Sequence, residues 1–380
     1  MSVMARAIPN PLYDLHEKAG AEFQPYDQVQ IVTTFGEPEA EYAAMRKAVA
    51  IIDMPQRGIL EVSGKDRLPF LNNLLTNQAW DKAANSGLKQ GDGIYAFFLG
   101  RNGRIVADVN VLERGDFAWL EMDARLVEPV RLAFDKYLFA EQVRLIDRVE
   151  SLHEFSLHGP GALGILRQVA GVEIPELPLL SSTSVRLFDA DVTVWRDDPA
   201  AVSGYHVLCD QMEAAGVWQR LIDQFAASTE LGRRPLRPVG WAAFNATRIE
   251  GGRPIFGIDF DDSVLPHETG QLDRAVSFTK GCYLGQEIVA RMQARGQWAR
   301  QLVGLKMADE ALPIAGAAIY DDHENQIGGI TSSTVSPVLS NAAICLAFVK
   351  KTFADVGAVV NVPAEGQIRK ATVSELPFVR

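Results

Sequence analysis

The segment KGCYLGQEIVAR, residues 280–291, places a cysteine between a lysine and a predicted helix. A glycine stands on each side of its Cys-Tyr-Leu core, and glycines let a backbone turn sharply or approach another group closely. Structural cysteines usually lie inside apolar runs, whereas Cys282 has Lys280 two residues before it. If residues 284–292 form a helix, the free N–H groups at its start and Lys280 would favour the Cys282 thiolate. Cys282 and Lys280 are therefore candidate catalytic residues, and the alternative is a turn that happens to contain a cysteine.

The size and composition indicate a soluble globular protein with more than one domain. The chain has 380 residues, of which 47% are hydrophobic and 22% charged, and one hydrophobic core rarely supports so long a chain. No apolar run approaches the roughly 20 residues that a membrane span needs. Residues 1–10 lack the continuous apolar stretch of a secretion signal. We expect a cytoplasmic protein that binds no membrane.

The net charge of −11 argues against binding to nucleic acid or to an anionic membrane. The charge is unevenly distributed, because ten lysines and arginines but only seven acids lie between Arg233 and Arg300. Two explanations fit this excess of positive charge equally well: chance clustering, or a pocket for a small anion beside the 280–291 segment. Both interpretations stay open from the sequence.

The three cysteines exclude several kinds of site. Cys209, Cys282 and Cys345 are too few and too widely spaced for a disulfide framework, and no C-x-x-C pair indicates zinc. Three thiols cannot supply the four thiolates that usually hold an iron–sulfur cluster. Cys209 and Cys345 lie in apolar strand-like runs, where we expect them to pack in the core. The sequence thus predicts no metal site.

The predicted elements favour an α+β fold that ends in a small β-barrel. Residues 94–99 and 104–112 read as strands joined by Arg101-Asn102-Gly103, and Asn-Gly between apolar runs is a strong hairpin signal. Strands and helices are interleaved with hairpins, which favours α+β over a doubly wound parallel sheet. From Gln301 onward, short strands follow one another without a long helix, as in a small barrel or sandwich. We expect one region over residues 1–297 and a barrel domain over 298–380.

Residues 280–287 resemble the signature of the YgfZ-type folate-binding proteins, which assist iron–sulfur cluster assembly and belong with the glycine-cleavage T-proteins, or aminomethyltransferases. The likeness is nearly full length. Residues 11–16 (PLYDLH) resemble the start of a T-protein, and residues 248–252 (RIEGG) resemble its Arg-Leu-Glu-x-Gly segment. Residues 302–305 (LVGL) and 328–332 (GGITS) resemble its C-terminal barrel. The octapeptide is specific, and the other segments occur in the family's order.

The resemblance implies a three-domain ring, in which two α+β lobes form a channel for tetrahydrofolate and a small β-barrel follows. In T-proteins an aspartate near the folate N5 supports catalysis and belongs to an Asp-Asp pair, where this chain has Ala107 and Asp108. Asp108 either lines the site or is a solvated strand residue, since alternate strand positions point outward. T-proteins also use the carboxylate of a Gly-Tyr-Glu to hold the pterin. This chain has His206 in place of that glutamate, and a neutral imidazole accepts only one hydrogen bond.

The same resemblance supplies the remaining candidate residues. Arg248 matches an arginine near the folate, and otherwise is a helix-surface residue. Glu250 is either a site carboxylate or the partner of a neighbouring arginine. Tyr205 could stack on a pterin or belong to the core, and Gln286 is otherwise an ordinary first-turn helix residue. The candidate catalytic residues are thus Cys282, Asp108 and Lys280, and the candidate cofactor-binding residues are Arg248, Tyr205, His206, Glu250 and Gln286.

These observations leave three functional hypotheses. The first is a tetrahydrofolate-binding accessory protein that assists iron–sulfur cluster assembly or repair through Cys282, with iron–sulfur client or assembly proteins as partners. The alternative is a tetrahydrofolate-dependent aminomethyltransferase or demethylase, in which Asp108 orients or helps to protonate the reacting nitrogen. The third is a relic of the folate site that only binds or acts as a scaffold. Whether the chain is an enzyme stays open at this point.

Overall fold

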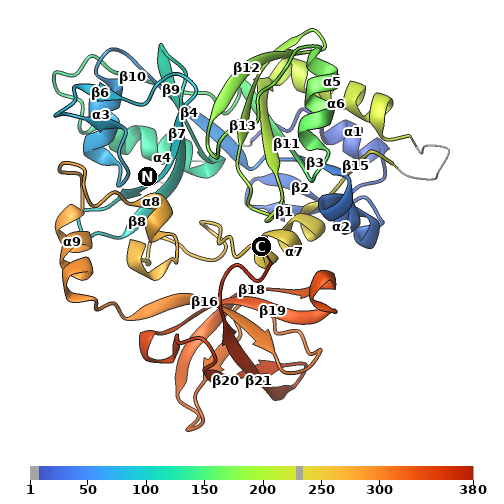
Figure 1. Ribbon diagram of the computed structural model, residues 1–380, viewed down its shortest axis with the longest axis vertical. Helices are drawn as coiled ribbons and strands as arrows, with labels where there is room; N and C mark the ends of the chain where they lie inside the picture. Colours follow the sequence, from blue (N-terminus) through green and yellow to red (C-terminus); the bar gives the residue numbers. More distant parts are fainter. Residues whose placement is uncertain (1–7, 228–233, 380) are drawn as a thin grey trace.

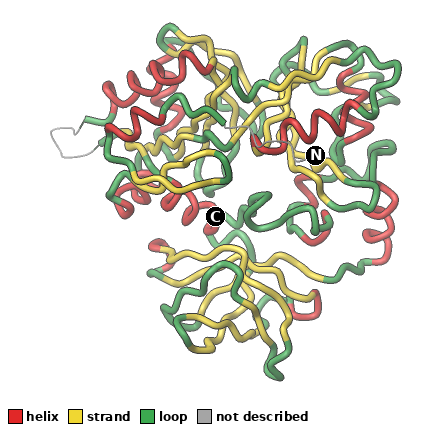
Figure 2. Tube along the Cα trace, turned by 180° about the vertical axis from the view of Figure 1, so that it is seen from behind, coloured by secondary structure: helices red, strands yellow, loops and turns green. Residues whose placement is uncertain are grey.

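The computed structural model describes residues 8–227 and 234–379. Within these ranges the chain forms two α+β lobes and a closed C-terminal barrel, grouped around the irregular segment 251–285 (Figure 1). The tube coloured by secondary structure shows the same division, with helices confined mainly to the two lobes (Figure 2). The α+β fold with a C-terminal β-barrel, predicted from the pattern of elements, is confirmed.

The first lobe is an antiparallel sheet in the order β10-β4-β9-β8-β7, with helices against one face. Alternate residues of β8, among them Ala107 and Val109, pack in the core beneath the helices, so Asp108 and Asn110 fall on the face without helices. The strands are β4 (Arg57–Ser63), β7 (Gly93–Leu99), β8 (Ile105–Glu113), β9 (Phe117–Asp123) and β10 (Arg144–Asp147); the helices are α3 (Arg67–Leu74) and α4 (Ala124–Asp135), and β5 (Trp80–Asp81) pairs with β6 (Ser86–Gly87).

The second lobe has a sheet in the order β12-β13-β14-β11-β3-β15, also covered by helices on one face. Tyr205 and Val207 of β14 pack in the core beneath those helices, which leaves His206 on the opposite face. The strands are β3 (Val49–Asp53), β11 (Leu152–His158), β12 (Ser182–Leu187), β13 (Ala190–Arg196), β14 (Gly204–Asp210) and β15 (Leu236–Pro238); the helices are α1 (Tyr13–Lys18), α5 (Ala162–Ala170) and α6 (Gln211–Phe225).

Further elements attach to this second lobe. The hairpin β1 (Glu22–Tyr26) and β2 (Val29–Thr34) precedes helix α2 (Pro38–Lys47), which packs against α7 (Trp241–Glu250). Helix α7 in turn lies against strand β18 of the barrel. It therefore joins the second lobe to the C-terminal domain (Figure 1).

The barrel closes in the order β16-β19-β18-β17-β20-β21 around its own apolar core. Cys345 lies in that core, as expected from its apolar surroundings in the sequence. The strands are β16 (Arg300–Met307), β17 (Ala318–Tyr320), β18 (Gln326–Ser336), β19 (Ala342–Lys350), β20 (Val359–Ala364) and β21 (Gln367–Ser374).

The glycines of the 280–291 segment fix the helix α9 (Gln286–Arg295) against the β7–β8 hairpin. Gly285 has φ +80°, and a Cβ there would lie 2.9 Å from the carbonyl oxygen of Gly100. Gly103, in the hairpin turn, has φ +74°, and a Cβ there would lie 2.7 Å from the Cβ of Ile288. Only glycine takes a positive φ and so close an approach without strain. The predicted hairpin and the predicted helix are thus both present and touch each other.

Segment 251–285 contacts both the first lobe and the barrel. Thr76 donates its hydroxyl to the Ala275 carbonyl over 2.7 Å, and the Ile105 N–H donates to the Val264 carbonyl over 3.0 Å. Toward the barrel, Thr331 of β18 donates to Oδ1 of Asp259 over 2.7 Å. The segment contains the one-turn helices η1 (Pro266–Glu268) and α8 (Leu272–Ala275).

Candidate functional site

A polar cavity lies between the helix-free faces of the two sheets. Its empty space amounts to about 710 Å³, including the part that opens to solvent. The first lobe contributes Arg57, Tyr95, Asp108, Asn110 and Glu121. The second lobe and neighbouring elements contribute Tyr26, Met54, Gln56, Trp195, Asp197, Pro199, His206, Trp241 and Phe244. Segment 251–285 contributes Arg253, Pro254, Ile255, Ile258 and Arg274. The cavity therefore draws on residues from across both lobes.

Asp108 presents one bonded and one free carboxylate oxygen to this cavity. Tyr95 donates its hydroxyl to Oδ2 over 3.0 Å, whereas Oδ1 is buried and has no hydrogen-bond partner among the described residues. Burial raises the pKa of Asp108 and the charge of Glu121 raises it further, although Arg57, Tyr95 and Arg274 act in the opposite direction. A carboxyl group of this kind is suited to exchanging a proton with a bound molecule.

Glu121 and Arg57 form a buried ion pair beside Asp108. Asn110 donates its side-chain amide to Oε2 of Glu121 over 2.7 Å, and its own Oδ1 finds no partner in the described part of the chain. The pair leaves Glu121 fully engaged. Asn110 and Asp108 are thus the groups of β8 that a ligand could still bind.

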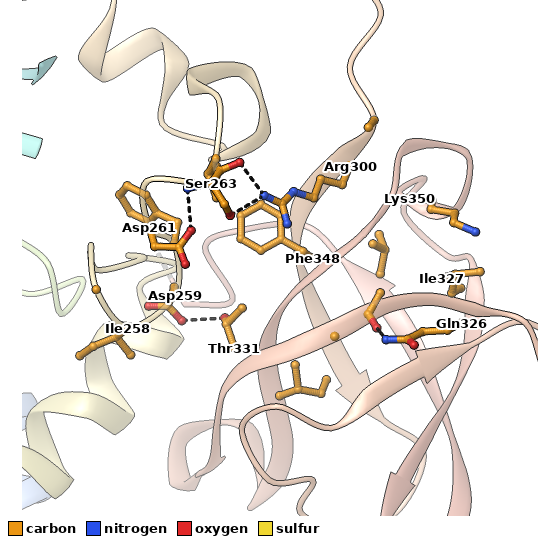
Figure 3. Close-up of a pocket in the computed structure, with 18 residues that line it drawn as sticks. Ile258, Asp259, Asp261, Ser263, Arg300, Gln326, Ile327, Thr331, Phe348 and Lys350 are labelled. Atoms are coloured by element: carbon orange, nitrogen blue, oxygen red, sulfur yellow. Dashed lines mark hydrogen bonds between the residues drawn. The ribbon is translucent and has the colours of Figure 1, made fainter. Parts of the chain in front are cut away.

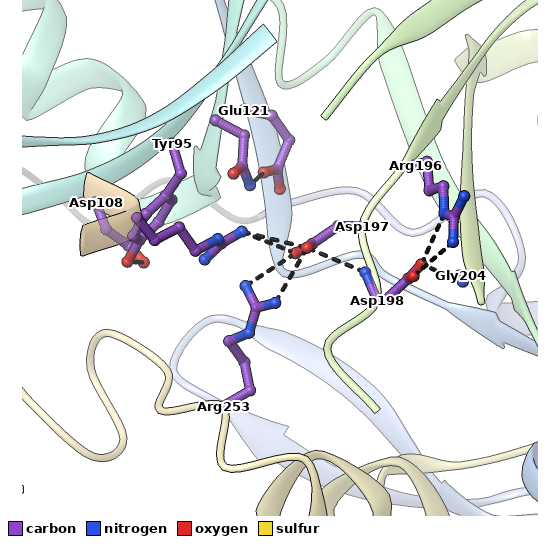
Figure 4. Close-up of polar contacts among 10 residues, drawn as sticks. Tyr95, Asp108, Glu121, Arg196, Asp197, Asp198, Gly204 and Arg253 are labelled. Carbon is purple, nitrogen blue, oxygen red and sulfur yellow. Dashed lines mark hydrogen bonds and ion pairs between the residues drawn. The ribbon is translucent and has the colours of Figure 1, made fainter. Parts of the chain in front are cut away.

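Asp197 forms ion pairs with two arginines at the other side of the cavity (Figure 4). Arg253 approaches its carboxylate at 3.3 and 3.4 Å, and Arg274 at 3.2 Å to both oxygens. Although burial opposes ionisation, the two guanidinium groups hold the pKa of Asp197 well below its usual range. Arg274 also lies 4.0 Å over the ring of Tyr95. This cluster therefore connects the second lobe to the hydroxyl that orients Asp108.

His206 lines the cavity between a carboxylate and an aromatic ring. Its Nδ1 lies 2.6 Å from Oε1 of Glu154, and its ring stacks on Trp195 with centroids 4.2 Å apart. Burial lowers the pKa of His206, but the hydrogen bond and charge of Glu154 outweigh burial, so the pKa is raised overall. Nε2 of His206 and Nε1 of Trp195 are both buried without a partner among the described residues.

The structure places Arg248 and Glu250 in the junction between α7 and the barrel, and neither lines the cavity. Arg248 has no exposed surface; its Nη1 lies 2.5 Å from Oδ2 of Asp259, and its Nη2 donates to Ser332 over 2.6 Å. Glu250 accepts a hydrogen bond from Tyr42 over 2.7 Å and forms a buried ion pair with Arg46. For Glu250 the open alternative was a neighbouring arginine, and Arg46 is that partner. Arg248, expected near the folate, is instead buried because Asp259 compensates its charge.

The residues of the 280–291 segment also lie outside the cavity. Burial lowers the pKa of Lys280 to about 7, and its ammonium points inward at the carbonyls of Asn72, Leu75 and Asn77, at 2.5, 2.5 and 3.0 Å. These three acceptors favour its charged form. Cys282 is exposed. Lys280 therefore binds carbonyls at the end of α3. The sequence led us to expect its ammonium beside the Cys282 thiol, but the side chain points inward instead.

Tyr205 and Gln286 have structural surroundings as well. Tyr205 is 2% exposed and packs in the apolar core of the second lobe, on the face of β14 opposite His206. Gln286 is the first residue of α9, and its N–H donates to the Tyr283 carbonyl over 3.2 Å. Of the candidate site residues, the cavity thus brings together Asp108 and His206.

A second hollow lies between segment 251–285 and the barrel (Figure 3). Its main charged groups are already bonded to protein. Asp259 binds Arg248, and Arg300 lies 3.3 Å from Glu268 and donates to Ser263 over 3.1 Å. Its lining, which also includes backbone of Gly328 and Gly329, carries fewer free polar groups than the cavity between the sheets. We therefore take that cavity as the candidate site.

The basic region between Arg233 and Arg300 contributes to the cavity only in part. Arg253 and Arg274 line it, whereas Arg248 and Lys280 are buried elsewhere. Arg233 lies outside the described residues. Some of these positive charges thus belong to the cavity, and others belong to buried contacts between parts of the protein.

Several cavity residues were missed by reasoning from the sequence. Arg57, Glu121 and Arg274 are charged side chains whose ion-pair partners lie 64 or more residues away, and no short motif surrounds them. A usable signal was the alternation within β9, where Glu121 interrupts an otherwise apolar run. Charged residues at buried strand positions indicate a paired internal site.

Two absences hold for the described parts of the chain. Over residues 8–227 and 234–379, no helix is long and apolar enough to cross a membrane. Within the same ranges, no group of three or more His, Cys, Asp and Glu side chains is placed to hold a metal ion.

Comparison with known proteins gives the same picture over nearly the whole chain. The family model of the GCVT N-terminal domain matches residues 12–280, and that of the glycine cleavage T-protein C-terminal barrel domain matches residues 300–380. The chain is 27% identical to an aminomethyltransferase of Bacillus licheniformis, covering 97% of this chain and 98% of that protein. It is 29% identical to an aminomethyltransferase of Symbiobacterium thermophilum, covering 97% and 96%.

The crystal structure of glycine cleavage system aminomethyltransferase T from Bartonella henselae has the same fold. It matches with a TM-score of 0.86 at 22% identity, over 98% of each chain. The two α+β lobes and the C-terminal barrel agree with the two family models, which match residues 12–280 and 300–380. The chain belongs to the glycine-cleavage T-protein family.

Proposed function

We propose that this protein is a tetrahydrofolate-dependent one-carbon transferase, an aminomethyltransferase or a demethylase, whose reaction takes place in the cavity between the two sheets. One observation carries the proposal. Buried polar atoms without a partner among the described residues gather in this cavity: Oε1 of Gln56, Oδ1 of Asp108, Oδ1 of Asn110, Nε1 of Trp195 and Nε2 of His206. Buried polar groups are normally hydrogen-bonded, so such a concentration supports a site that a polar ligand or ordered water fills.

The residues present fit the pterin ring of a folate. A pterin is flat and carries both N–H donors and acceptor atoms along its edge, which matches the mixed acceptors and donors left free in the cavity. The rings of Trp195, Trp241 and Phe244 line the cavity and supply aromatic surface beside a flat ring. Gln56, Asp108 and Asn110 would accept hydrogen bonds from it. When bound, tetrahydrofolate supplies a nitrogen, N5, that accepts the one-carbon unit.

Asp108 is the proposed proton-exchanging residue. Its Oδ2 is held by Tyr95, so Oδ1 has a fixed position from which it can take or give a proton. A raised pKa brings the carboxyl group closer to the working pH and so makes both directions of transfer easier. Arg274, stacked over Tyr95, keeps that phenol in place. Asp108, held by Tyr95, would thus orient the reacting nitrogen and exchange a proton with it.

Ala107 does not weaken this proposal. In the sequence it stands where T-proteins have a second aspartate, which suggested that the site lacks one carboxylate. The Ala107 side chain lies in the apolar core of the first lobe, on the face of β8 opposite Asp108. An aspartate at this position would point toward that core. Asp108, the aspartate of the pair that this chain retains, is the one that faces the cavity.

The accessory role in iron–sulfur cluster assembly is the second candidate, and it rests on Cys282. That thiol is exposed and does not line the cavity. The relatives described above are named aminomethyltransferases. If the accessory role held, iron–sulfur client or assembly proteins would have to meet Cys282 at the surface. A binding-only relic is the third candidate, and the proton-exchanging geometry of Asp108 favours a transferase over it.

Two measurements test the proposal. Calorimetric titration with tetrahydrofolate tests binding, and incubation with tetrahydrofolate and a panel of one-carbon donors (aminomethylated thiols and methylated amines) tests transfer. We expect saturable binding and formation of 5,10-methylene- or 5-methyl-tetrahydrofolate. Cys282→Ala should transfer as well as the wild type. No binding at millimolar ligand and no product from any donor would overturn the proposal.

The accessory role has its own test. Deletion of the gene should lower iron–sulfur enzyme activity in cells if that role holds, and wild type but not Cys282→Ala should restore it. Equal rescue by both would remove the role proposed for the thiol. The two sets of results therefore separate the first candidate from the second.

A further inference from the structure

We infer that Glu154 and His206 form a pair that holds protons on both imidazole nitrogens, so that His206 presents an N–H donor to an acceptor oxygen, a carbonyl or carboxylate, of the bound ligand. The use of tetrahydrofolate as that ligand rests on the proposed function. The state of the pair itself is a property of the protein alone. The inference thus identifies His206 as a residue that selects which edge of a ligand enters this part of the cavity.

The geometry fixes the His206 ring on three sides. Glu154 is bonded to Nδ1 over 2.6 Å, from the neighbouring strand β11. Trp195 is the cross-strand partner of His206 on β13 and stacks on it at an angle of 28°. His158 meets it edge-on, with centroids 5.7 Å apart. The ring therefore cannot turn, and Nε2 is left facing the cavity without a protein partner in the described chain.

The charges around the ring favour the imidazolium. Glu154 is the nearest acid, and Glu121 of β9 and Asp197, which follows β13, add negative charge. With Glu154 ionised, its Oε1 accepts from Nδ1–H, so the second proton of the imidazolium sits on Nε2. Burial and the charge of Glu121 raise the pKa of Glu154, whereas the hydrogen bond and charge of His206 act to lower it. Asp197 is offset by its two arginines and Glu121 by Arg57. Glu154 therefore supplies the largest part of the attraction for the proton.

The neighbouring His158 does not compete for that proton. Its Nε2 is bonded to Ser156 over 2.9 Å, and burial together with the charge of His206 lowers the pKa of His158 to about 3. His158 is thus neutral at physiological pH. The other ring beside His158, Phe244 of α7, is uncharged, and the charge of Asp197 raises the pKa of His158 less than burial and His206 lower it. His206 is the member of this group that can carry the positive charge.

An N–H donor at this place has a chemical consequence for recognition. A ligand oxygen that accepts from Nε2–H makes a charge-assisted hydrogen bond and strengthens the hold of His206 on its proton. A ligand N–H at the same place would meet a donor and would have to displace the proton. Binding of the correct ligand edge should therefore draw a proton into the protein whenever His206 is partly neutral in the free state.

Nuclear magnetic resonance of the imidazole nitrogens tests the pair without any ligand. The chain has six histidines, and His206→Gln identifies the signal by its loss. We expect that signal to titrate above the ordinary histidine value of about 6.5, with the proton of the neutral form on Nδ1. Glu154→Gln should move the titration to lower pH. Titration at or below the ordinary value, or no change in Glu154→Gln, would overturn the inference.

Calorimetry of tetrahydrofolate binding tests the consequence. Titrations at about pH 8 in buffers of different ionisation enthalpy report the protons taken up on binding. The wild type and the exposed control His323→Gln should take up a fraction of a proton; His206→Gln should take up none and bind about ten-fold or more weakly. Binding without proton uptake, or with proton release, would overturn the inference while leaving the proposed function standing. Absence of binding would overturn the proposed function, and the resonance measurement would still decide the state of His206.

Discussion

The hydroxyl of Tyr95 lies 3.0 Å from Oδ2 of Asp108 and fixes one oxygen of a carboxylate whose other oxygen faces the cavity. Tyr95 of β7 and Asp108 of β8 lie diagonally across the hairpin that the sequence predicts, because Tyr95 pairs with Asn110 and Asp108 pairs with Phe97. Tyr95 is itself held by the Arg274 guanidinium over its ring. A single antiparallel hairpin thus delivers both the proposed proton-exchanging group and the group that orients it.

Replacing Asp108 should abolish most of the transfer activity. We expect Asp108→Asn to slow one-carbon transfer by about 10²–10⁴-fold, the usual contribution of a positioned acid or base, while tetrahydrofolate still binds because the amide keeps the shape and an acceptor oxygen. Product formation and calorimetric affinity measure the two effects. The matched control is Asp116→Asn, because Asp116 is exposed and lies in the turn between β8 and β9. Wild-type transfer in Asp108→Asn would exclude the role proposed for this carboxylate.

The same substitution should change how stability depends on pH. Burial raises the pKa of Asp108 in the folded protein, so the stability that its neutral form contributes is present at low pH and is lost as the pH rises through the folded pKa. We expect Asp108→Asn to melt at the same temperature as the wild type near pH 4 and at a higher temperature at pH 7–8. Scanning calorimetry at both pH values checks the difference. A wild type that melts higher than the variant at pH 8 would show that Asp108 is stabilised as the anion.

Lys280 should matter for stability and not for chemistry. Its ammonium binds three buried or partly buried carbonyls at the end of α3, and Lys280→Met would leave them without that donor. A loss of roughly 1–3 kcal/mol in unfolding free energy is expected, measured by denaturant or thermal unfolding. Lys82→Met, at an exposed lysine, serves as control. A stable Lys280→Met variant that had lost transfer activity would instead point to a chemical role.

Arg248 should behave as a structural residue of the junction. Its buried ion pair with Asp259 leaves a charge uncompensated when one partner is removed, which costs about 3–5 kcal/mol. We expect Arg248→Met to lower the melting temperature strongly, while the molecules whose barrel stays docked bind tetrahydrofolate with unchanged affinity. Arg291→Met, on the exposed side of α9, controls for loss of positive charge. Weakened binding at unchanged stability would place Arg248 in contact with the ligand after all.

Local signals account for what the sequence could predict of the fold. Asn102-Gly103 predicted the hairpin, whose strands run Gly93–Leu99 and Ile105–Glu113. In the structure Gly103, and not Asn102, takes the positive φ of the turn. The helix expected over 284–292 occupies Gln286–Arg295. The short strands beyond Gln301 form the barrel. These features depend on neighbours in the sequence, which is why they were accessible.

The candidate site was only partly accessible for the opposite reason. Asp108 and His206 line the cavity because strand alternation turns them to the helix-free faces. Arg248 is a cation like the cavity residues Arg253 and Arg274, but its buried partner Asp259 lies in an irregular segment that no periodicity predicts. Glu154 and Trp195 reach His206 across neighbouring strands of the sheet. Pairings of that kind are set by sheet order, which the sequence alone did not reveal.

Asp259 and Ile258 are adjacent in the chain, yet one is held by Thr331 and Ser332 of the barrel and the other lines the cavity. We therefore expect docking of the barrel and occupancy of the cavity to be thermodynamically linked, because whatever favours the docked state would raise the fraction of molecules able to bind. A change as remote as Ser332→Ala can then lower the apparent ligand affinity without touching the ligand. For this protein, a weakened binding constant alone does not locate a residue in the site.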